Sequence, residues 1–522
     1  MGFALLWIEA LATVWLLAAA VVAIAGRRQR RWVQLAVAMV ALPLPAYAFV
    51  TTWLALQHSG EAASPMVIYI ASWVTLANAG VLALLIVGLW RRGEPTEPRA
   101  RSWKPGRLAV AGGAAGLLVA LTLWTMTNAL LSRVAALRAE AGTLALAAAP
   151  PRLPDHENAA RYYEAAAELL REAWGPGDDD KLTTWLAAER LNADDADLRD
   201  YLRRRRAAID LIDKATALPG CRFDTSPAEI SGANVGISHV RAAANLLALE
   251  SRDFAARGIA IEAGGRTPKR GIEGALTRID QIRRMAQHVA GNPDVQSILA
   301  AAALETHALR ALDRVLVEGV ANTANLPSRD DPSLYRADLR RALRMEQALV
   351  YGRLAGIAEQ ASGYGLVWLE DDLAVHEALF RRLTEELAKP YPECLRGWAG
   401  VEAQLRPLPG VLHRLSTPAY ARLLPAVARA DASRRVAYFA VAVARYLRDK
   451  HQLPGRAEDV VPTYLPQVPT DPFTGQPLKL KTTADGVVVY SVGPDGVDDG
   501  GAPLTEDKPQ KVDIRVRIGN KK

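Results

Sequence analysis

The 522-residue sequence lacks the short motifs by which many catalytic sites are found. It has no His-Glu-x-x-His, no Gly-x-Ser-x-Gly, no phosphate-binding glycine loop and no Cys-x-x-Cys. The histidines of the 132–450 region are scattered, and none pairs with another at ligand spacing: His156, His239, His288, His307, His376 and His413. We expect each to be a surface residue or a hydrogen-bonded core residue. These absences argue against an enzyme, although an active site assembled from distant residues stays an alternative.

Cysteine is scarce. The chain has two, Cys221 and Cys394, so at most one intramolecular disulfide can form. Sequence cannot show whether the two side chains meet. A bridge and two separately buried thiols therefore both stay open.

Lysine and arginine are missing from four long apolar runs: 3–25, 32–56, 66–90 and 108–131. A helix of about 20 residues crosses a bilayer core of about 30 Å, so each run is long enough to span. Charges placed at the centre of a span cost about 2.5–3.5 kcal/mol each, so their absence is informative. The runs predict a four-helix transmembrane anchor over residues 1–131. Glu9 is the one carboxylate within them, which favours an anchor over a transporter.

Basic residues gather in two of the three loops between these runs. Loop 26–31 has four arginines, loop 91–107 has six basic residues, and loop 57–65 has none. Because positive loops stay inside, the N-terminus and residues 132–522 are predicted to be extracytoplasmic. Residues 1–131 carry +6 of the net charge of +7. The remainder is nearly neutral, so the bilayer rather than nucleic acid is the expected partner.

The region 132–432 is rich in Ala, Leu, Arg and Glu, which favour helix. Gly291 is typical of a helix end, and Asn292-Pro293 of the start of the next helix. Asp331-Pro332 is likewise typical of a helix start. Short breaks between helices favour a bundle or a solenoid-like domain, and a tetratricopeptide-like scaffold stays open. The basic run Arg203–Arg206 is interpreted as a solvated helix face. Helices are expected at 157–174, 194–217, 238–263, 270–290, 293–318, 332–360, 371–388 and 416–450.

The character of the chain changes at residue 433. A helix ends at Leu453-Pro454-Gly455, and strands are predicted at 477–482 and 486–492 with a turn at Asp485-Gly486. A third strand is predicted at 512–518. Between the second and third lies a loop rich in aspartate and glycine, within VVVYSVGPDGVDDGG (487–501).

The order of short motifs in 433–518 is Leu-Pro, Tyr-Leu-Pro, Asp-Pro-Phe-x-Gly-x-Pro-Leu and Tyr-Ser-Val-Gly-Pro-Asp-Gly. It resembles the C-terminal region of the major pseudopilin of type II secretion systems. The N-terminus departs from that family, because MGFALLWIEA has no basic leader and four apolar runs follow. The chain is therefore similar to uncharacterised bacterial multi-pass membrane proteins with a pseudopilin-like tail. The resemblance implies a small α+β module over 433–522 and a bacterial inner-membrane location.

The resemblance also implies calcium in the final loop. Asp495 matches the family's Asp-Gly element, and Asp513 matches its closing Asp-Ile, while Asp498 and Asp499 have the right chemistry without a secure equivalent. Calcium takes six to eight oxygen ligands, and the glycines of the loop allow the tight turns that aim carbonyls inward. A plain acidic turn is the alternative. The candidate metal ligands are Asp495, Asp498, Asp499 and Asp513.

Together these features predict a mainly α protein with a four-helix transmembrane anchor, an extracytoplasmic helical domain and a pseudopilin-like module. We expect a non-catalytic scaffold or binding protein of the bacterial envelope, related to secretion and partnered by another envelope protein. The alternative is an envelope enzyme whose active site is assembled from distant residues of the helical domain.

Overall fold

The computed structural model describes residues 105–149, 153–223, 235–263, 271–318, 334–360, 365–405, 411–483, 485–502 and 513–519. These residues are mainly helical, as predicted. The chain divides into two compact units, one of Met1–Ala141 with Val350–Leu373 and one of Gly142–Leu349 with Ala374–Lys522. We call them unit 1 and unit 2.

The transmembrane prediction needs correction. The runs 3–25, 32–56 and 66–90 lie outside the described residues, and 108–131 lies within α5 (Pro105–Ala148). Among the described residues, no helix combines the length and the apolar character needed to cross a bilayer. On this finding, the four-helix anchor and the multi-pass inner-membrane placement with residues 132–522 outside are corrected.

In unit 1, α5 meets α13 (Leu334–Gln360) through an ion pair between Arg138 and Glu359, with the Nη2 and Oε2 atoms 2.6 Å apart. Val134 and Leu137 of α5 are buried. An exposed pair of this kind contributes at most about 1 kcal/mol, so apolar burial is the larger stabilising term here.

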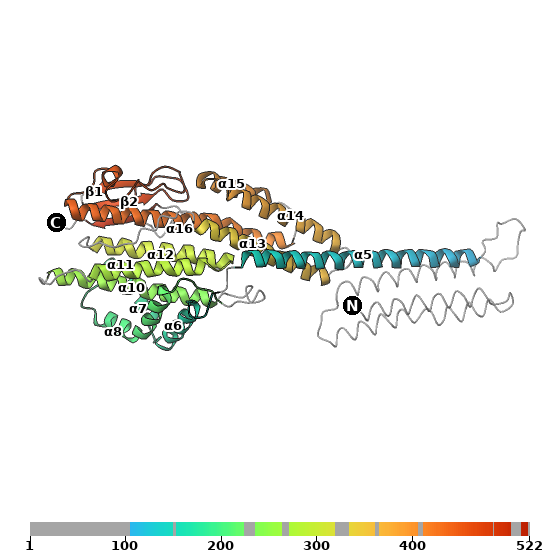
Figure 1. Ribbon diagram of the computed structural model, residues 1–522, viewed down its shortest axis with the longest axis horizontal. Coiled ribbons are helices and arrows are strands. Elements are labelled where there is room, and N and C mark those ends of the chain that lie inside the picture. Colours follow the sequence, from blue (N-terminus) through green and yellow to red (C-terminus); the bar gives the residue numbers. More distant parts are fainter. Residues whose placement is uncertain are drawn as a thin grey trace, which may run out of the picture. The chain divides into compact units, whose positions relative to one another are not determined.

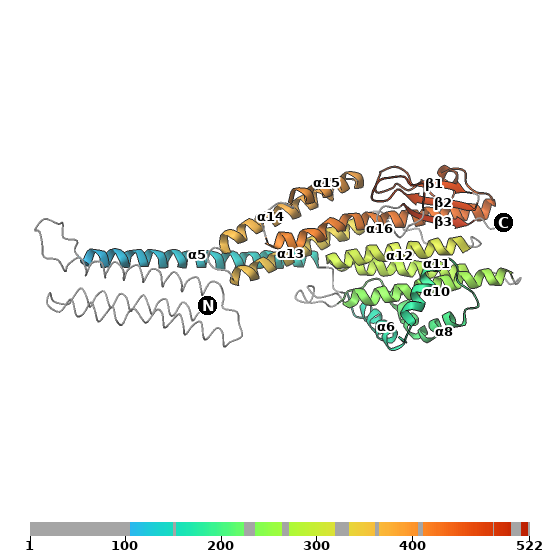
Figure 2. The same cartoon turned by 180° about the vertical axis from the view of Figure 1, so that it is seen from behind.

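Unit 2 is a layer of long helices with further elements on both sides (Figures 1 and 2). Helices α10, α11, α12 and α16 pack side by side in that order, and α6 packs against α9 and α10. Residues 334–349 of α13 and the end of α14 (Gly365–Glu386) also belong to unit 2. The other helices of the unit are α6 (Ala160–Glu172), α7 (Asp178–Ala187), α8 (Ala196–Arg204), α9 (Arg206–Ala217), α10 (Val235–Ala263), α11 (Gly271–Ala290), α12 (Val295–Glu318), α15 (Tyr391–Leu405) and α16 (Val411–Lys450).

The 3.6-residue period explains most of these helices. On α12 the predicted apolar stripe is buried at Ile298, Leu309 and Leu312. The predicted helix 194–217 is instead two helices, because Arg205 leaves helical geometry between α8 and α9. Helix α7 begins within the predicted break 175–180, where three aspartates favour the positive end of a helix dipole.

Arginines from neighbouring helices occupy several helix C-termini. The last carbonyls of a helix have no partner within it, and the helix dipole makes that end negative. Arg252 of α10 donates to the carbonyls of Trp185, Leu186 and Ala188 at the end of α7. Arg336 and Arg340 of α13 donate to the Leu387 carbonyl after α14, at 2.6 and 2.8 Å. These contacts tie each helix end to its neighbour.

Three antiparallel strands follow α16: β1 (Lys479–Thr483), β2 (Gly486–Ser491) and β3 (Ile514–Gly519), in the order β1-β2-β3. The three predicted strands are confirmed. The sheet lies against α12 and α16 (Figure 1). The Arg517 backbone N–H of β3 donates to Asp313 Oδ1 on α12 at 2.7 Å, and its guanidinium Nη2 to Oδ2 at 3.0 Å. The predicted boundary between 432 and 433 falls inside α16, which runs without a break.

Candidate functional site

The aspartate-rich loop leaves β2 through a series of glycines. Gly493, Gly496, Gly500 and Gly501 have φ angles of 73, 68, 67 and 73°, in the left-handed region that suits glycine. The loop returns to the sheet at Asp513, whose Oδ2 accepts a hydrogen bond from the Gly501 N–H at 2.7 Å. Glycine thus allows the tight winding that the sequence predicts.

The four predicted ligands take different roles. The carboxylate of Asp495 accepts from the Val497 N–H at 3.1 Å, which closes a local turn. That of Asp498 accepts from the Gly500 N–H at 3.0 Å and forms an ion pair with Lys479 of β1. Asp499 is exposed, whereas Asp513 is buried. The hydrogen bond from Lys479 lowers the pKa of Asp498, while burial raises that of Asp513, helped by Asp499 and Asp498.

These contacts bring Asp498, Asp499 and Asp513 into one electrostatic neighbourhood, with Asp495 in a turn of its own. In the part of the chain that the structure describes, no group of three or more His, Cys, Asp or Glu side chains has the geometry of a metal site. The Lys479 ammonium supplies a positive charge at Asp498. Calcium at this loop stays a prediction.

One buried carboxylate that the sequence analysis does not identify, Asp471, holds the start of the loop. Asp471, in the Asp-Pro-Phe-x-Gly stretch, is 2% exposed. It accepts from Ser491 Oγ at 2.9 Å, from the Val492 N–H at 3.0 Å and from the Phe473 N–H at 3.0 Å. It therefore joins its own turn to the end of β2. An aspartate before proline, at a turn, is the signal that could have indicated this role.

The most unusual group of ionisable side chains lies in the interior of unit 2. Glu305 of α12 and Asp431 of α16 are each 1% exposed. The Tyr335 hydroxyl of α13 donates to Glu305 Oε1 at 2.6 Å, and the Tyr391 hydroxyl of α15 donates to Asp431 Oδ2. Five helices meet at this cluster, which we call the buried carboxyl cluster. Its members are Arg283, Glu305, Tyr335, Tyr391, Asp431 and Arg434.

Burial dominates the electrostatics of this cluster. It raises the pKa of Asp431 to about 7, against the lowering effects of the Tyr391 hydrogen bond, Arg435 and Arg434. Burial also raises the pKa of Glu305, while Arg283 and Arg434, each 3.8 Å away, lower it. Raised carboxyl pKa values of this kind are typical of catalytic acids and bases, and also of structural ion networks.

The helical pattern carries a signal for this cluster. Glu305 stands on the same stripe as Ile298 and Leu312, seven residues before and after it, so its side chain points into the core. Asp431 likewise lies seven residues after buried Leu424. A carboxylate on an apolar stripe indicates a buried charge. Its partners come from other helices, which the sequence does not identify.

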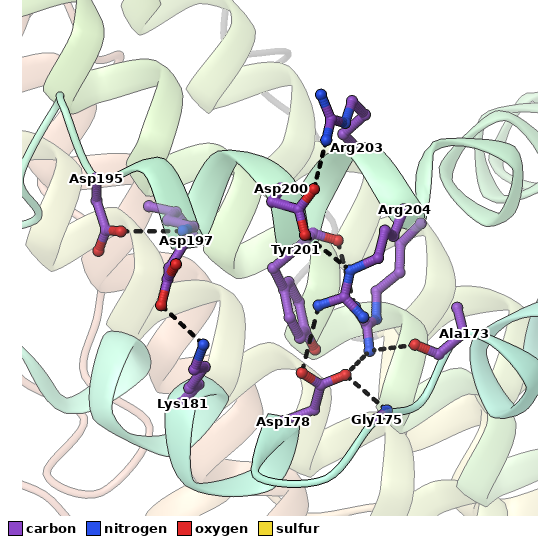
Figure 3. Close-up of polar contacts among 12 residues, drawn as sticks. Ala173, Gly175, Asp178, Lys181, Asp195, Asp197, Asp200, Tyr201, Arg203 and Arg204 are labelled. Atoms are coloured by element: carbon purple, nitrogen blue, oxygen red, sulfur yellow. Dashed lines mark hydrogen bonds and ion pairs between the residues drawn. The ribbon is translucent and has the colours of Figure 1, made fainter.

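A second charged network joins α6, α7 and α8 (Figure 3). Arg205 Nη2 donates to Asp178 Oδ2 at 2.6 Å and to the Ala173 carbonyl at 3.1 Å, and its guanidinium lies 3.6 Å from the Tyr201 ring centre. Although burial opposes this, hydrogen bonds from Arg205 and the Gly175 N–H hold the pKa of Asp178 below its ordinary value. Arg205 is 1% exposed. The solvated-face interpretation of 203–206 is thus wrong for this residue, because its side chain caps α6.

His288 and the two cysteines are interior residues. Burial lowers the pKa of His288 to about 4, so the ring is neutral. Its Nε2 donates to the Leu218 carbonyl at 3.1 Å, which leaves Nδ1 to accept from the Tyr163 hydroxyl at 2.9 Å. Cys221 and Cys394 are buried free thiols, and burial raises the pKa of both. The alternative of two separate thiols is the one observed.

Comparison of the chain with protein-family models, with curated proteins and with solved structures finds no match.

Proposed function

We propose that the protein is a non-catalytic scaffold or binding protein whose helical unit 2 presents a surface to another protein. The observation that carries this proposal is the depth of the buried carboxyl cluster. Glu305 and Asp431 have the raised pKa values expected of catalytic groups, yet each is 1% exposed. A general acid or base has to come within hydrogen-bond reach of its substrate. Their partners are instead tyrosines and arginines of neighbouring helices.

The ties between elements support the same proposal. Arginines hold the ends of α7 and α14, and Arg517 fastens the sheet to α12. A surface held in one shape binds a partner with little ordering cost. The pseudopilin resemblance of the tail makes secretion components the first partners to test.

A second candidate, an enzyme, is favoured by one observation. Asp431 titrates near neutral pH and lies in a cluster with a second carboxyl and two tyrosine hydroxyls. Catalysis would require this cluster to open to solvent. An Asp431→Asn variant should then lose the activity while keeping its partners.

Calcium is proposed as a ligand of the loop. Burial raises the pKa of Asp513, and the nearby Asp499 and Asp498 raise it further, so a bound cation would relieve their repulsion. Lys479 relieves part of it through Asp498. The metal would thus have to compete with a lysine.

The scaffold proposal is tested by crosslinking in the native cells. The tagged full-length chain is recovered after brief crosslinking, and co-purifying proteins are quantified by mass spectrometry for the wild type, Asp431→Asn and a tag-only control. We expect the same proteins, in a fixed ratio to the chain, with the wild type and with Asp431→Asn. Recovery no higher than with the tag alone would contradict the proposal.

A further inference from the structure

Four arginines lie where β3 and α16 meet α12: Arg310 and Arg314 on α12, Arg429 on α16 and Arg515 on β3. We call them the arginine strip. Arg310 and Arg314 are one turn apart, so they share a face of α12. Arg310 is exposed, and the other three are partly exposed.

The docking of β3 on α12 places Arg515 beside this face. Arg517 pairs with Asp313, and a Cβ on Gly519 would lie 2.9 Å from the Val317 carbonyl oxygen. From Arg517 to Gly519 the strand advances about 6.6 Å, and from Asp313 to Val317 the helix advances about 6 Å. Residues of β3 two apart therefore lie beside residues of α12 four apart. One step back along the same row of β3 therefore keeps Arg515 beside α12, where the charges of Asp313 and Arg314 act on it.

Electrostatics agrees with this placement. Burial lowers the pKa of Arg429, and the positive charge of Arg310 adds to the effect. Burial also lowers the pKa of Arg515. Asp313 and Asp513 oppose this shift, while Arg517 and Arg314 add to it. Arg515 also donates to the Gly501 carbonyl at 2.7 Å, so it is the partnered member of the strip. Like charges thus act on one another across all three elements.

Few carboxylates within the protein neutralise the positive charges of the strip. In the part of the chain that the structure describes, Arg310, Arg314 and Arg429 have no carboxylate within ion-pair distance. Asp313, on the same helix, is already paired with Arg517. Most arginines of the buried networks, by contrast, meet an acid, as Arg205 meets Asp178.

We infer that the arginine strip is the binding surface for an acidic segment of a partner protein. This inference rests on the proposed scaffold function and names the chemistry of the partner. The planar guanidinium fork matches a carboxylate, so aspartate and glutamate side chains fit the unpaired arginines. Specific nucleic-acid binding engages about 6–10 phosphates along an extended basic face. The strip offers three unpaired arginines, and residues 132–522 carry a net charge of only +1.

The test measures binding of a fluorescent octaglutamate peptide to the full-length chain by anisotropy, with Arg310→Glu/Arg314→Glu as the variant. Arg171→Glu/Arg203→Glu is the matched control, because both of its arginines are exposed, lie on α6 and α8, and change the net charge equally. We expect salt-dependent binding that the strip variant weakens at least about tenfold and the control leaves within about twofold.

Four results would overturn the inference: no peptide binding at low salt, an unchanged affinity in the strip variant, an equal loss in the control, or tighter binding of duplex DNA of equal charge. The crosslinking experiment distinguishes failure of the strip inference from failure of the scaffold proposal, because it measures whether any partner is recovered. If partners are recovered with the strip variant as with the wild type, only the strip inference fails.

Discussion

At the scale of single residues, Asp431 is the most informative group. Its carboxyl is held by the Tyr391 hydroxyl of α15, and Arg434 and Arg435 lie on its own helix, with Glu305 facing it from α12. Burial is the largest of these influences, so the neutral acid is the favoured form in the fold. The Tyr391 hydrogen bond favours the charged carboxylate, but the cost of burying that charge is larger, so burial sets the direction of the shift.

This gives a pH prediction with a definite sign. The pKa of Asp431 is about 7 in the folded protein, against an ordinary 3.8, so the folded state binds the extra proton between these values. Its contribution to stability is greatest below pH 3.8, falls as pH rises from there, and is lost above 7. The difference corresponds to roughly 4 kcal/mol at most.

Asp431→Asn removes the titration but keeps an oxygen for the Tyr391 hydroxyl. We expect the free energy of unfolding of the variant, from urea titrations of the full chain, to exceed that of the wild type by a margin that is small at pH 5 and clearly larger at pH 8. Glu305 is unchanged in this variant, so its own titration contributes to both proteins. Equal destabilisation at both pH values would show that Asp431 is charged in the fold.

The residue scale is also where prediction from sequence falls short. Glu305 and Asp431 can be recognised as inward-facing, because they sit on apolar helical stripes. Their partners Tyr335 and Tyr391 stand 30 and 40 residues away, on other helices. Side-chain pairs of this kind depend on how helices pack. Arg205 shows the same limit, since a run of four arginines does not reveal which one is buried.

At the scale of elements, the arginines at helix ends decide how helices meet. Arg336 and Arg340 hold the carbonyl of Leu387, and Arg336 also lies 4.6 Å from the Tyr391 ring centre. The link from α14 to α15 therefore depends on α13. Removing these charges leaves carbonyls without donors at a helix end.

We expect Arg336→Met/Arg340→Met to raise amide hydrogen exchange of residues near 387–391 at least about tenfold, the change that corresponds to about 1.4 kcal/mol of local stability. Arg344→Met is the matched control, because Arg344 is exposed on the same helix. Protection that stays the same in the double variant would mean that the caps do not stabilise this junction.

The loop after β2 makes a separate prediction. If calcium binds there, the melting temperature of the full chain should be higher in Ca²⁺ than in chelator, and Asp513→Asn should abolish the difference. Lys479→Met removes a competing cation, so it should enlarge the shift. Identical melting in Ca²⁺ and chelator for the wild type and Lys479→Met would identify the loop as an ion-paired turn.

Elements are the scale that the sequence predicts best. The strands of the tail and the long helices with strong apolar stripes lie where expected, because period and turn residues determine them locally. Helix α15 lies between the predicted helices 371–388 and 416–450, and its Pro392 stands in the first turn, where proline is tolerated. The apolar runs predict membrane spans, whereas no helix of the described residues is a candidate span.

At the scale of the molecule, unit 2 combines a layer of helices, a docked sheet and a buried carboxyl cluster. The order α10-α11-α12-α16 and the seat of β3 on α12 come from long-range packing. Neither composition nor period predicts them. This arrangement creates the arginine strip from three distant segments and encloses the carboxyls that would otherwise suggest catalysis.

The central claim is that unit 2 binds a protein partner without changing it chemically. A binding titration tests this claim most directly. The purified full-length chain is titrated with the protein recovered by crosslinking, and the partner is then examined by intact-mass measurement. We predict saturable binding, equal for the wild type and Asp431→Asn, with the mass of the partner unchanged. A partner that is cleaved or modified by the wild type but not by Asp431→Asn would contradict the claim and identify an enzyme.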